Sequence, residues 1–247
     1  MSSILGKARS AVLTSVFCRN IQLTNRAPVV SFCFDDFPRS AYANGAAILN
    51  SHGVRGTFYV ALGLMDTENA LGPQFSQSDL EGVLNDGHEL GSHTLSHVSC
   101  RQLSTSAFER DVHRGKDAIR ELIGTNAANF AYPFGHVTVA AKRRIGSVMR
   151  TCRGIYGGVN GPSVDCNLLR ANSLYGDTDQ LPKVELLLTN HQEAAQWIVF
   201  YTHDVRANPS EFGCTPSLLE KTLSAALRLG YSVETIDGVM TKHVAQE

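Results

Sequence analysis

Short apolar runs alternate with helical patterns along the chain from residue 28 onward. The runs at 29–34, 56–60 and 197–202 have the length and the β-branched and aromatic content of buried strands. Between such runs, apolar residues recur every three or four positions, and several of these helical patterns close at a glycine. The alternation predicts about seven β-α units arranged around a parallel sheet or barrel.

The best-marked helix precedes Gly124. Ser106, followed three residues later by Glu109, has the pattern of a capping box, and Phe108 and Ile119 belong to an apolar stripe. Another helix follows a cap at Ser76 or Ser78. This helix lies around 80–84. The remaining predicted elements are strands at 129–132, 168–174 and 233–236, and helices at 42–49, at 184–195 and at 216–229.

The chain has 247 residues, of which 43% are hydrophobic, so it can bury the core of one barrel-sized domain. We assign residues 28–247 to this domain and residues 1–27 to an N-terminal segment that forms an appended helix. The six cysteines are scattered without metal-binding or redox spacing, which predicts free structural thiols.

The charge balance narrows the class of partner. With 22 basic and 23 acidic residues, the net charge of -1 offers no basic field for nucleic acid or for an anionic membrane surface. No run approaches the ~18 apolar residues of a membrane span, and no clear signal peptide is present. We expect a soluble, cytoplasmic protein with a small or neutral partner; the sequence leaves its oligomeric state open.

Side chains that can bind a metal lie at the ends of predicted strands. Asp35 and Asp36 follow the run at 29–34, and His203 follows the run at 197–202. His93 and His97 are four positions apart, which would place both imidazoles on one face of a helical turn within reach of one metal ion. Because β/α barrels build active sites at the carboxyl ends of their strands, we predict a metal site there.

Two imidazoles and one carboxylate, with further positions open to water, are typical of a hydrolytic zinc site. The same set suits Fe(II) in oxygenases, but those enzymes usually take a histidine and the acid from one His-x-acid segment on a strand. Here the only such segment with glutamate, at 191–193, lies on a predicted helix. A hydrolase is therefore favoured over an oxygenase, and over surface histidines beside a turn or a helix cap formed by the aspartates.

The motifs at 34–36 (Phe-Asp-Asp), 92–97 (Ser-His-Thr-Leu-Ser-His) and 132–135 (Tyr-Pro-Phe-Gly), followed by His203, are similar in order and separation to those of the NodB-homology polysaccharide deacetylases. The resemblance spans residues 28–240. It implies a distorted (β/α)7 barrel and metal-dependent hydrolysis of N-acetyl or O-acetyl groups, usually on sugars. It also implies one divalent ion, for which we expect Zn2+ with Co2+, Fe2+ and Ni2+ as alternatives.

The resemblance assigns a role to each residue of these motifs. Asp35 would be the general base, because the metal neutralises the neighbouring carboxylate and leaves Asp35 free to take a proton. Asp36, His93 and His97 would hold the metal, and His203 would protonate the leaving group. The backbone N-H of Phe134 would stabilise the oxyanion, and four further residues are candidates for lining the acetyl pocket: Phe37, Leu95, Tyr132 and Trp197.

The sequence departs from the family pattern at three places. Phe37 replaces the usual glycine after the aspartate pair and is expected to narrow or reshape the groove. Ala131 replaces the usual arginine that fixes the base, so we expect Arg170, at a neighbouring strand end, to supply the positive charge to Asp35. The acid that tunes His203 has no clear match, and three candidates stay open: Asp165, Asp177 and Asp204.

These observations favour a hydrolase that removes acetyl groups from an N-acetylated saccharide. The first alternative is hydrolysis of a small amide such as allantoin on the same fold. The second is a catalytically silent, carbohydrate-binding relative, against which the intact set of acids and histidines argues.

Overall fold

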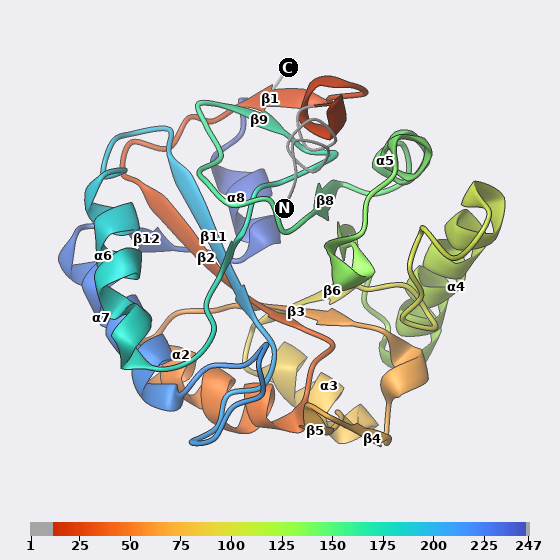
Figure 1. The fold of residues 1–247 in the computed structure, drawn as a ribbon, viewed down its shortest axis with the longest axis horizontal. Coiled ribbons are helices and arrows are strands. Elements are labelled where there is room, and N and C mark those ends of the chain that lie inside the picture. The colour runs from red at the N-terminus through yellow and green to blue at the C-terminus, as the bar shows by residue number, and fades with distance from the viewer. Residues whose placement is uncertain (1–11, 246–247) are drawn as a thin grey trace, which may run out of the picture.

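A curled sheet of parallel strands forms the centre of the protein, and helices cover its outside (Figure 1). The structure is a computed structural model that describes residues 12–245. Along the sheet the order is β10 (Asn172–Ser173), β11 (Trp197–Thr202), β2 (Val29–Asp35), β3 (Thr57–Val60), β6 (Glu89–Ser92), β7 (Asn129–Ala131) and β8 (Thr151–Arg153), and β12 (Ser232–Val233) pairs beside β2. This is the distorted (β/α)7 barrel that the sequence predicts.

The strands β2 and β11 form the buried centre of the sheet. They pair in parallel over six residues, from Trp197 opposite Val29 to Thr202 opposite Phe34, and every residue of both strands is buried. Their continuous apolar sequences suit a parallel sheet whose two faces are both covered. The strands predicted at 29–34, 56–60, 129–132 and 197–202 are therefore confirmed to within one residue at each end.

The helices and short sheets that surround this sheet follow the predicted β-α alternation. Two antiparallel pairs of short strands lie outside it, β1 (Asn20–Gln22) with β9 (Ser163–Asp165) and β4 (Glu68–Asn69) with β5 (Gly72–Pro73). The helices are α2 (Ala47–Ser51), α3 (Gln77–Asn85), α4 (Thr105–Ile123), α5 (Val139–Gly146), α6 (Leu181–Thr189), α7 (Pro216–Arg228) and α8 (Ile236–Lys242), with short turns η1 (Ala41–Ala46), η2 (Leu62–Leu64), η3 (Pro133–Gly135) and η4 (Thr178–Gln180).

The seam between β8 and β10 is irregular. A strand was expected at 168–174, but there Leu169 forms a single parallel bridge to Arg153, and only Asn172–Ser173 pair with β11. In between, the Asn160 side chain bonds the backbone N-H and C=O of Arg170 in place of a neighbouring strand. The segment 168–174 therefore contacts β8 at one end and β11 at the other, and it forms no continuous strand.

The two ends of the chain also differ from expectation. Of the predicted N-terminal helix, residues 12–15 are helical and residues 1–11 lie outside the described part of the chain; β1 then pairs with β9. The strand predicted at 233–236 ends at Val233, because the Thr235 side chain accepts a hydrogen bond from Gly238 N and starts α8.

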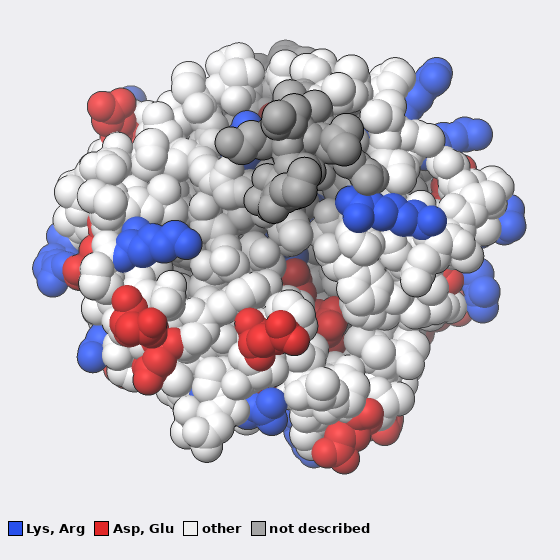
Figure 2. Space-filling model, viewed as in Figure 1, with Lys and Arg blue, Asp and Glu red and all other residues white. Residues whose placement is uncertain are grey.

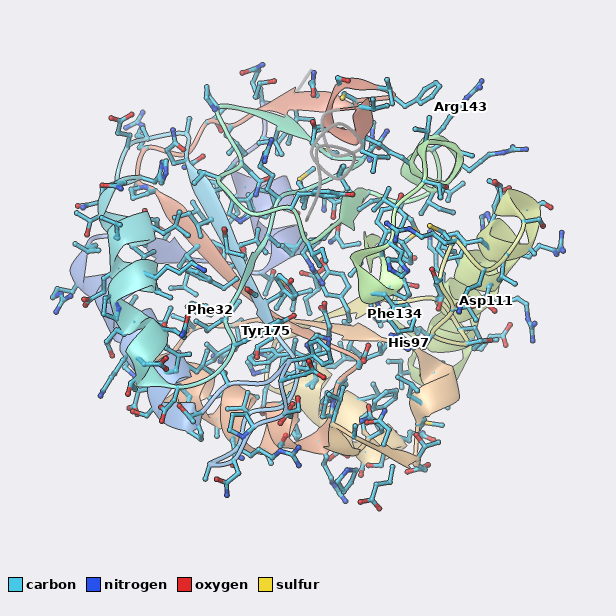
Figure 3. All side chains as sticks on the ribbon, in the orientation of Figure 1. Phe32, His97, Asp111, Phe134, Arg143 and Tyr175 are labelled. Carbon is cyan, nitrogen blue, oxygen red and sulfur yellow. The ribbon has the colours of Figure 1, made fainter. Side chains whose placement is uncertain are left out.

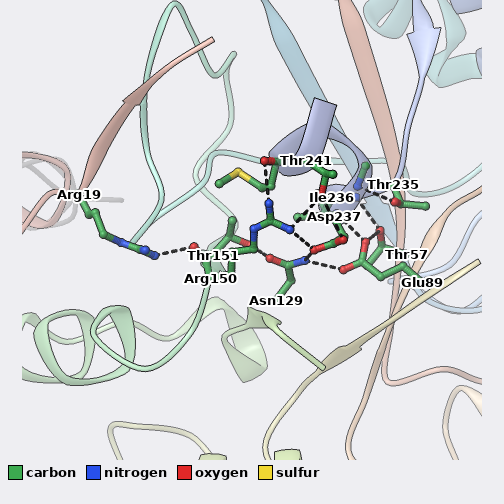
Figure 4. Close-up of polar contacts among 12 residues, drawn as sticks. Arg19, Thr57, Glu89, Asn129, Arg150, Thr151, Thr235, Ile236, Asp237 and Thr241 are labelled. Atoms are coloured by element: carbon green, nitrogen blue, oxygen red, sulfur yellow. Dashed lines mark hydrogen bonds and ion pairs between the residues drawn. The ribbon is translucent and has the colours of Figure 1, made fainter. Parts of the chain in front are cut away.

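A polar cluster joins the first residues of β3, β6 and β7, at the ends of these strands away from the candidate site (Figure 4). Both carboxylate oxygens of Glu89 are bonded: Asn129 Nδ2 donates to one at 2.7 Å, and Thr57 Oγ1 and Asp237 N donate to the other, each at 2.9 Å. Burial raises the pKa of Glu89 above its usual range, and the three donors offset part of that shift. Arg150 pairs with Asp237 and ties α8 to the sheet.

The start of α4 differs from the predicted capping box. Ser104 is the cap, because its side chain accepts a hydrogen bond from Ala107 N, and Ser106 lies inside the first turn. The capping box with Ser106 and Glu109 is therefore wrong. The predicted end is confirmed, since Gly124 takes the left-handed conformation with φ of 71°.

Substitution of the two serines separates these descriptions of the helix start. Ser104→Ala removes the cap and should lower the free energy of unfolding by about 1 kcal/mol. Ser106→Ala is the matched control and should change it by less than about 0.5 kcal/mol, because Ser106 is an exposed residue of the first turn. Urea unfolding followed by circular dichroism measures both free energies. A larger loss of stability for Ser106→Ala than for Ser104→Ala would support the capping box instead.

Candidate active site and metal centre

Two neighbouring carboxylates at the end of β2 reach different partners. Asp35 is the last residue of the strand, and Asp36 follows with φ of 60°, in the left-handed region that non-glycine residues rarely adopt. This turn separates the two buried side chains. Asp35 pairs with an arginine, whereas Asp36 lies beside the two histidines that the sequence singled out.

The three predicted metal ligands lie together. Their ligand atoms all lie within 4.8 Å of one another, with Nε2 of His93 and of His97 at 3.3 Å and 2.9 Å from Asp36 Oδ1. Asp36 Oδ1 is buried, yet it forms no well-oriented hydrogen bond. A buried oxygen without a well-oriented donor, facing two imidazole nitrogens, fits a divalent cation that all three atoms could bind.

The His93 ring is fixed by a backbone carbonyl. Its Nδ1 lies 2.8 Å from the Ala131 oxygen, so Nδ1 carries the proton and donates it, which leaves the Nε2 lone pair for a metal. Ala131 thus contributes the backbone oxygen that orients this histidine.

The His93–His97 segment is a loop, and the prediction of a helical turn is wrong. Thr94 and His97 have φ of 67° and 50°. Asp111 of α4 holds the loop, because its Oδ1 accepts from Leu95 N and Ser96 N, each at 3.0 Å. A side chain sixteen positions away in sequence thus replaces the hydrogen bonds of a helical turn.

Electrostatics keep Asp36 ionised. Burial alone would raise its pKa, but hydrogen bonds and positive charge from protonated His93 and His97 outweigh burial and hold the pKa of Asp36 well below its usual range; a bound cation would take the place of these protons. The carboxylate is therefore available as a negatively charged ligand.

Arg153, at the end of β8, supplies the positive charge to Asp35. Its Nη2 pairs with Asp35 Oδ1, and its guanidinium lies between the rings of Tyr59 and Tyr201, 5.0 Å and 4.9 Å from their centroids. The guanidinium is buried, which disfavours its charge, but the Asp35 carboxylate dominates and raises the pKa of Arg153. The pair is thus a buried ion pair whose guanidinium is flanked by two tyrosine rings.

Arg170 does not contact Asp35, so the expectation that it would fix the base is wrong. Its Nη1 donates to Gly157 O at 3.1 Å, and its backbone is bonded by Asn160 at the irregular barrel seam. Arg153 was missed because β8 has only three residues. The signal that could have found it is the position of an arginine just before Gly154, after the buried pair Thr151–Cys152.

His203 lies on the opposite wall of the site, after β11. Its Nδ1 is 3.1 Å from the Phe212 carbonyl oxygen, and its ring packs against Phe212 and Tyr175. A backbone carbonyl therefore orients this imidazole. The three candidate acids have other partners: Asp165 pairs with Lys142, Asp177 accepts from Thr215, and Asp204 pairs with Arg206 and accepts from Ser210.

A cavity of about 320 Å³ joins these groups. Asp35, Asp36, His93, His97 and His203 all line it. Apolar and aromatic walls complete it, formed by Leu71, Phe134, Ile155, Tyr175 and Phe212. Figure 2 shows the hollow in the middle of this face, with acidic atoms inside it.

Among the predicted pocket residues, Phe134 lines the cavity. Its side chain is 54% exposed and its ring lies 4.6 Å from that of His97. Figure 3 shows Phe134 and His97 close together on one side of the site and Tyr175 on the other.

The four pocket candidates do not line the cavity, and that expectation is wrong. Trp197 is buried in β11, where its indole N-H donates to Ser31 Oγ. Phe37 is fully buried and stacks on Phe75 at 5.1 Å, because its left-handed backbone turns the ring into the core. It therefore does not narrow the groove. Tyr132 is buried against Phe130, and Leu95 belongs to the histidine loop.

Left-handed backbone gathers at this site. The described residues include eight non-glycine positions with positive φ. Three of them, Asp36, His97 and Phe134, line the cavity, and Phe37 and Thr94 directly follow the cavity residues Asp36 and His93 in sequence. Each such residue costs of order 1 kcal/mol, and clusters of them are typical of functional sites that the surrounding fold holds in place.

A family model described as polysaccharide deacetylase matches residues 22–148, just over half of the chain. The chain belongs to the polysaccharide deacetylase family. This confirms the resemblance inferred from the four motifs. The match includes Asp35, Asp36, His93, His97 and Phe134, whereas Arg153 and His203 lie beyond it.

The chain is similar to one named deacetylase in sequence and to one solved domain in structure. The peptidoglycan-N-acetylglucosamine deacetylase PgdA of Listeria monocytogenes is 28% identical over 118 residues, which are 47% of this chain and 24% of that protein. The chain thus matches about a quarter of the length of this relative. The Xyl-CE4 domain of a multidomain xylanase from a Trinervitermes trinervoides hindgut metagenome superposes with a TM-score of 0.61 at 17% identity, covering 87% of this chain and 90% of that domain.

A family 4 carbohydrate esterase pseudoenzyme from Bacillus anthracis shares the fold as well. It superposes with a TM-score of 0.53 at 14% identity, over 88% of this chain and 68% of that one. Membership of the deacetylase family therefore does not by itself establish activity, which depends on the residues in the site.

Removal of one histidine tests the metal centre of this deacetylase-family protein. His97→Ala should reduce bound metal from about one equivalent per chain to a small fraction of that, because only two ligands remain. The measurement is elemental analysis after loading with Zn2+ and dialysis. His113→Ala, an exposed histidine of α4, is the control and should keep its metal. Full retention of metal by folded His97→Ala protein would contradict the ligand assignment.

Proposed function

We propose that the protein is a metal-dependent hydrolase that removes acetyl groups from an N-acetylated saccharide. The observation that carries the proposal is the two-sided cavity. One wall holds the Asp36–His93–His97 cluster beside a separate carboxylate, Asp35, and the other wall holds His203. A metal-binding cluster, a base and an acid around one space are what hydrolysis of an amide requires.

A divalent ion, for which we propose Zn2+ because two imidazoles and a carboxylate suit it, supplies Lewis acidity and an acidified water molecule when bound. Asp35 then serves as the base. Arg153 contacts its Oδ1, so the other oxygen takes the proton. The ion pair with Arg153 keeps Asp35 from acting as a metal ligand.

His203 serves as the acid on the far wall. Its Nδ1 faces the Phe212 carbonyl, so the ring is held and Nε2 is the nitrogen that protonates the departing amine. The backbone N-H of Phe134, in its left-handed turn beside His97, is the proposed donor to the oxyanion; loss of one such donor typically costs ~10²–10³ in rate.

The size of the site favours a saccharide over a small amide. The cavity of about 320 Å³ adjoins a second cavity of about 540 Å³, which allantoin would leave empty. The exposed faces of Phe134 and Phe212 offer apolar surface of the kind that sugar rings pack against. PgdA, by its name, acts on N-acetylglucosamine in peptidoglycan, which supports the same substrate class.

A screen for acetate release decides between these functions. Metal-loaded protein is assayed with N-acetylglucosamine oligomers and, in parallel, for hydrolysis of allantoin. Acetate release from the oligomers supports the proposal. Turnover of allantoin alone would replace it with the small-amide alternative, and binding without turnover of either would favour a silent carbohydrate-binding protein.

Substitution of Asp35 tests the division of roles between the two aspartates. Asp35→Asn should lower kcat by about 10²–10⁴, because the amide cannot take the proton, while metal content stays near about one equivalent. Steady-state kinetics and elemental analysis on the same preparation measure both. Asp117→Asn, on exposed α4 surface, is the control. A wild-type rate for Asp35→Asn would show that another group is the base.

A further inference from the structure

The second cavity continues directly from the metal site. It has a volume of about 540 Å³ and shares Ile155, Tyr175 and Tyr201 with the first. Figure 3 shows Tyr175 between α6 on one side and Phe134 and His97 on the other. Both volumes fall within the ~300–1,000 Å³ typical of small-molecule sites, so a ligand of two sugar units could occupy the pair.

One face of α6 forms a wall of the second cavity. Lys183, Leu187 and Asn190 are spaced by four and three positions, which places them on the same side of the helix, and all three line the cavity. Leu186 of the same helix is 62% exposed and Ile155 is 43% exposed. This surface is open and carries both apolar and polar side chains, which suits contact with a sugar ring and its hydroxyl groups.

Among the described residues, the second cavity is lined by a cationic side chain and by no carboxylate. Two aspartates line the first cavity, whereas Lys183 lines the second and no aspartate or glutamate does. Within residues 12–245, no carboxylate forms an ion pair with Lys183; by contrast, Arg228 of the neighbouring α7 pairs with Glu185 of α6. Lys183 is thus a solvent-accessible cation at the edge of a substrate-sized space.

We propose that the second cavity binds the sugar next to the one that is deacetylated, and that Lys183 selects an anionic substituent on that sugar. The inference rests on the proposed function for the position of the acetylated sugar. An ammonium group binds a carboxylate or a phosphate ester as a point charge, so both share the required chemistry. A neutral sugar would leave Lys183 hydrated and gain nothing from it.

Three matched disaccharides test the proposal by binding. The ligands are N,N'-diacetylchitobiose, which is neutral; N-acetylglucosaminyl-N-acetylmuramic acid, which has the same linkage and adds a carboxylate; and a phosphorylated chitobiose. Isothermal titration uses metal-loaded Asp35→Asn protein to prevent turnover. The same titrations are made in the background of Lys183→Gln and of a control, Lys116→Gln, which changes a lysine of α4 away from both cavities.

We expect at least one anionic disaccharide to bind about two- to fivefold more tightly than chitobiose at low salt, which is the range of a solvent-exposed ion pair. Lys183→Gln should remove this preference and leave the affinity for chitobiose unchanged, whereas Lys116→Gln should keep it. The preference should also fall in about 0.5 M NaCl because salt screens exposed charges. The two anionic ligands show whether the carboxylate or the phosphate is preferred.

Equal affinity for all three ligands, a preference that survives Lys183→Gln, or no binding of any ligand would each overturn the proposal. Failure of the proposed function gives a different result. Selective binding of an anionic disaccharide without acetate release by the unsubstituted protein would contradict the deacetylase function and support the anionic subsite. Acetate release without a Lys183-dependent preference would support the deacetylase function and contradict the anionic subsite.

Discussion

The separation of two adjacent carboxylates at the end of β2 is the constraint on which the site depends. Asp35 and Asp36 are both buried, and two like charges in one space would raise the pKa of one of them. The fold gives each its own partner: Arg153 from β8 for Asp35, and the two histidines after β6 for Asp36. Loss of one partner from a buried pair typically costs ~3–5 kcal/mol, so the site and the stability of the barrel are linked.

The irregular barrel seam shapes the rest of the site. Arg153 lies where β8 meets the segment at 168–174, and its bridge to Leu169 is the point at which regular strand pairing stops. From there the chain reaches Tyr175, which lies in both cavities. A continuous strand at this edge would close the sheet, so the gap in strand pairing beside the arginine also leaves the space of the second cavity.

The sequence predicts the central strands, the order of β-α units and the grouping of Asp36, His93 and His97, because each depends on local periodicity or on residues at strand ends. The misses depend on contacts that are distant in sequence. The His93–His97 spacing suggests a helical turn, but Asp111 on α4 draws the loop open. Arg153 belongs to a strand too short to show periodicity, and Phe37 enters the core through a backbone conformation that no spacing reveals.

The most direct test of this account is X-ray diffraction from crystals of the zinc-loaded protein, with data recorded at the zinc absorption edge. The account predicts one anomalous peak about 2.0–2.2 Å from a carboxylate oxygen of Asp36 and from Nε2 of His93 and His97, with Asp35 still paired to Arg153 and outside coordination distance. A peak bound by Asp35, or no peak among these three residues in zinc-loaded crystals, would contradict it.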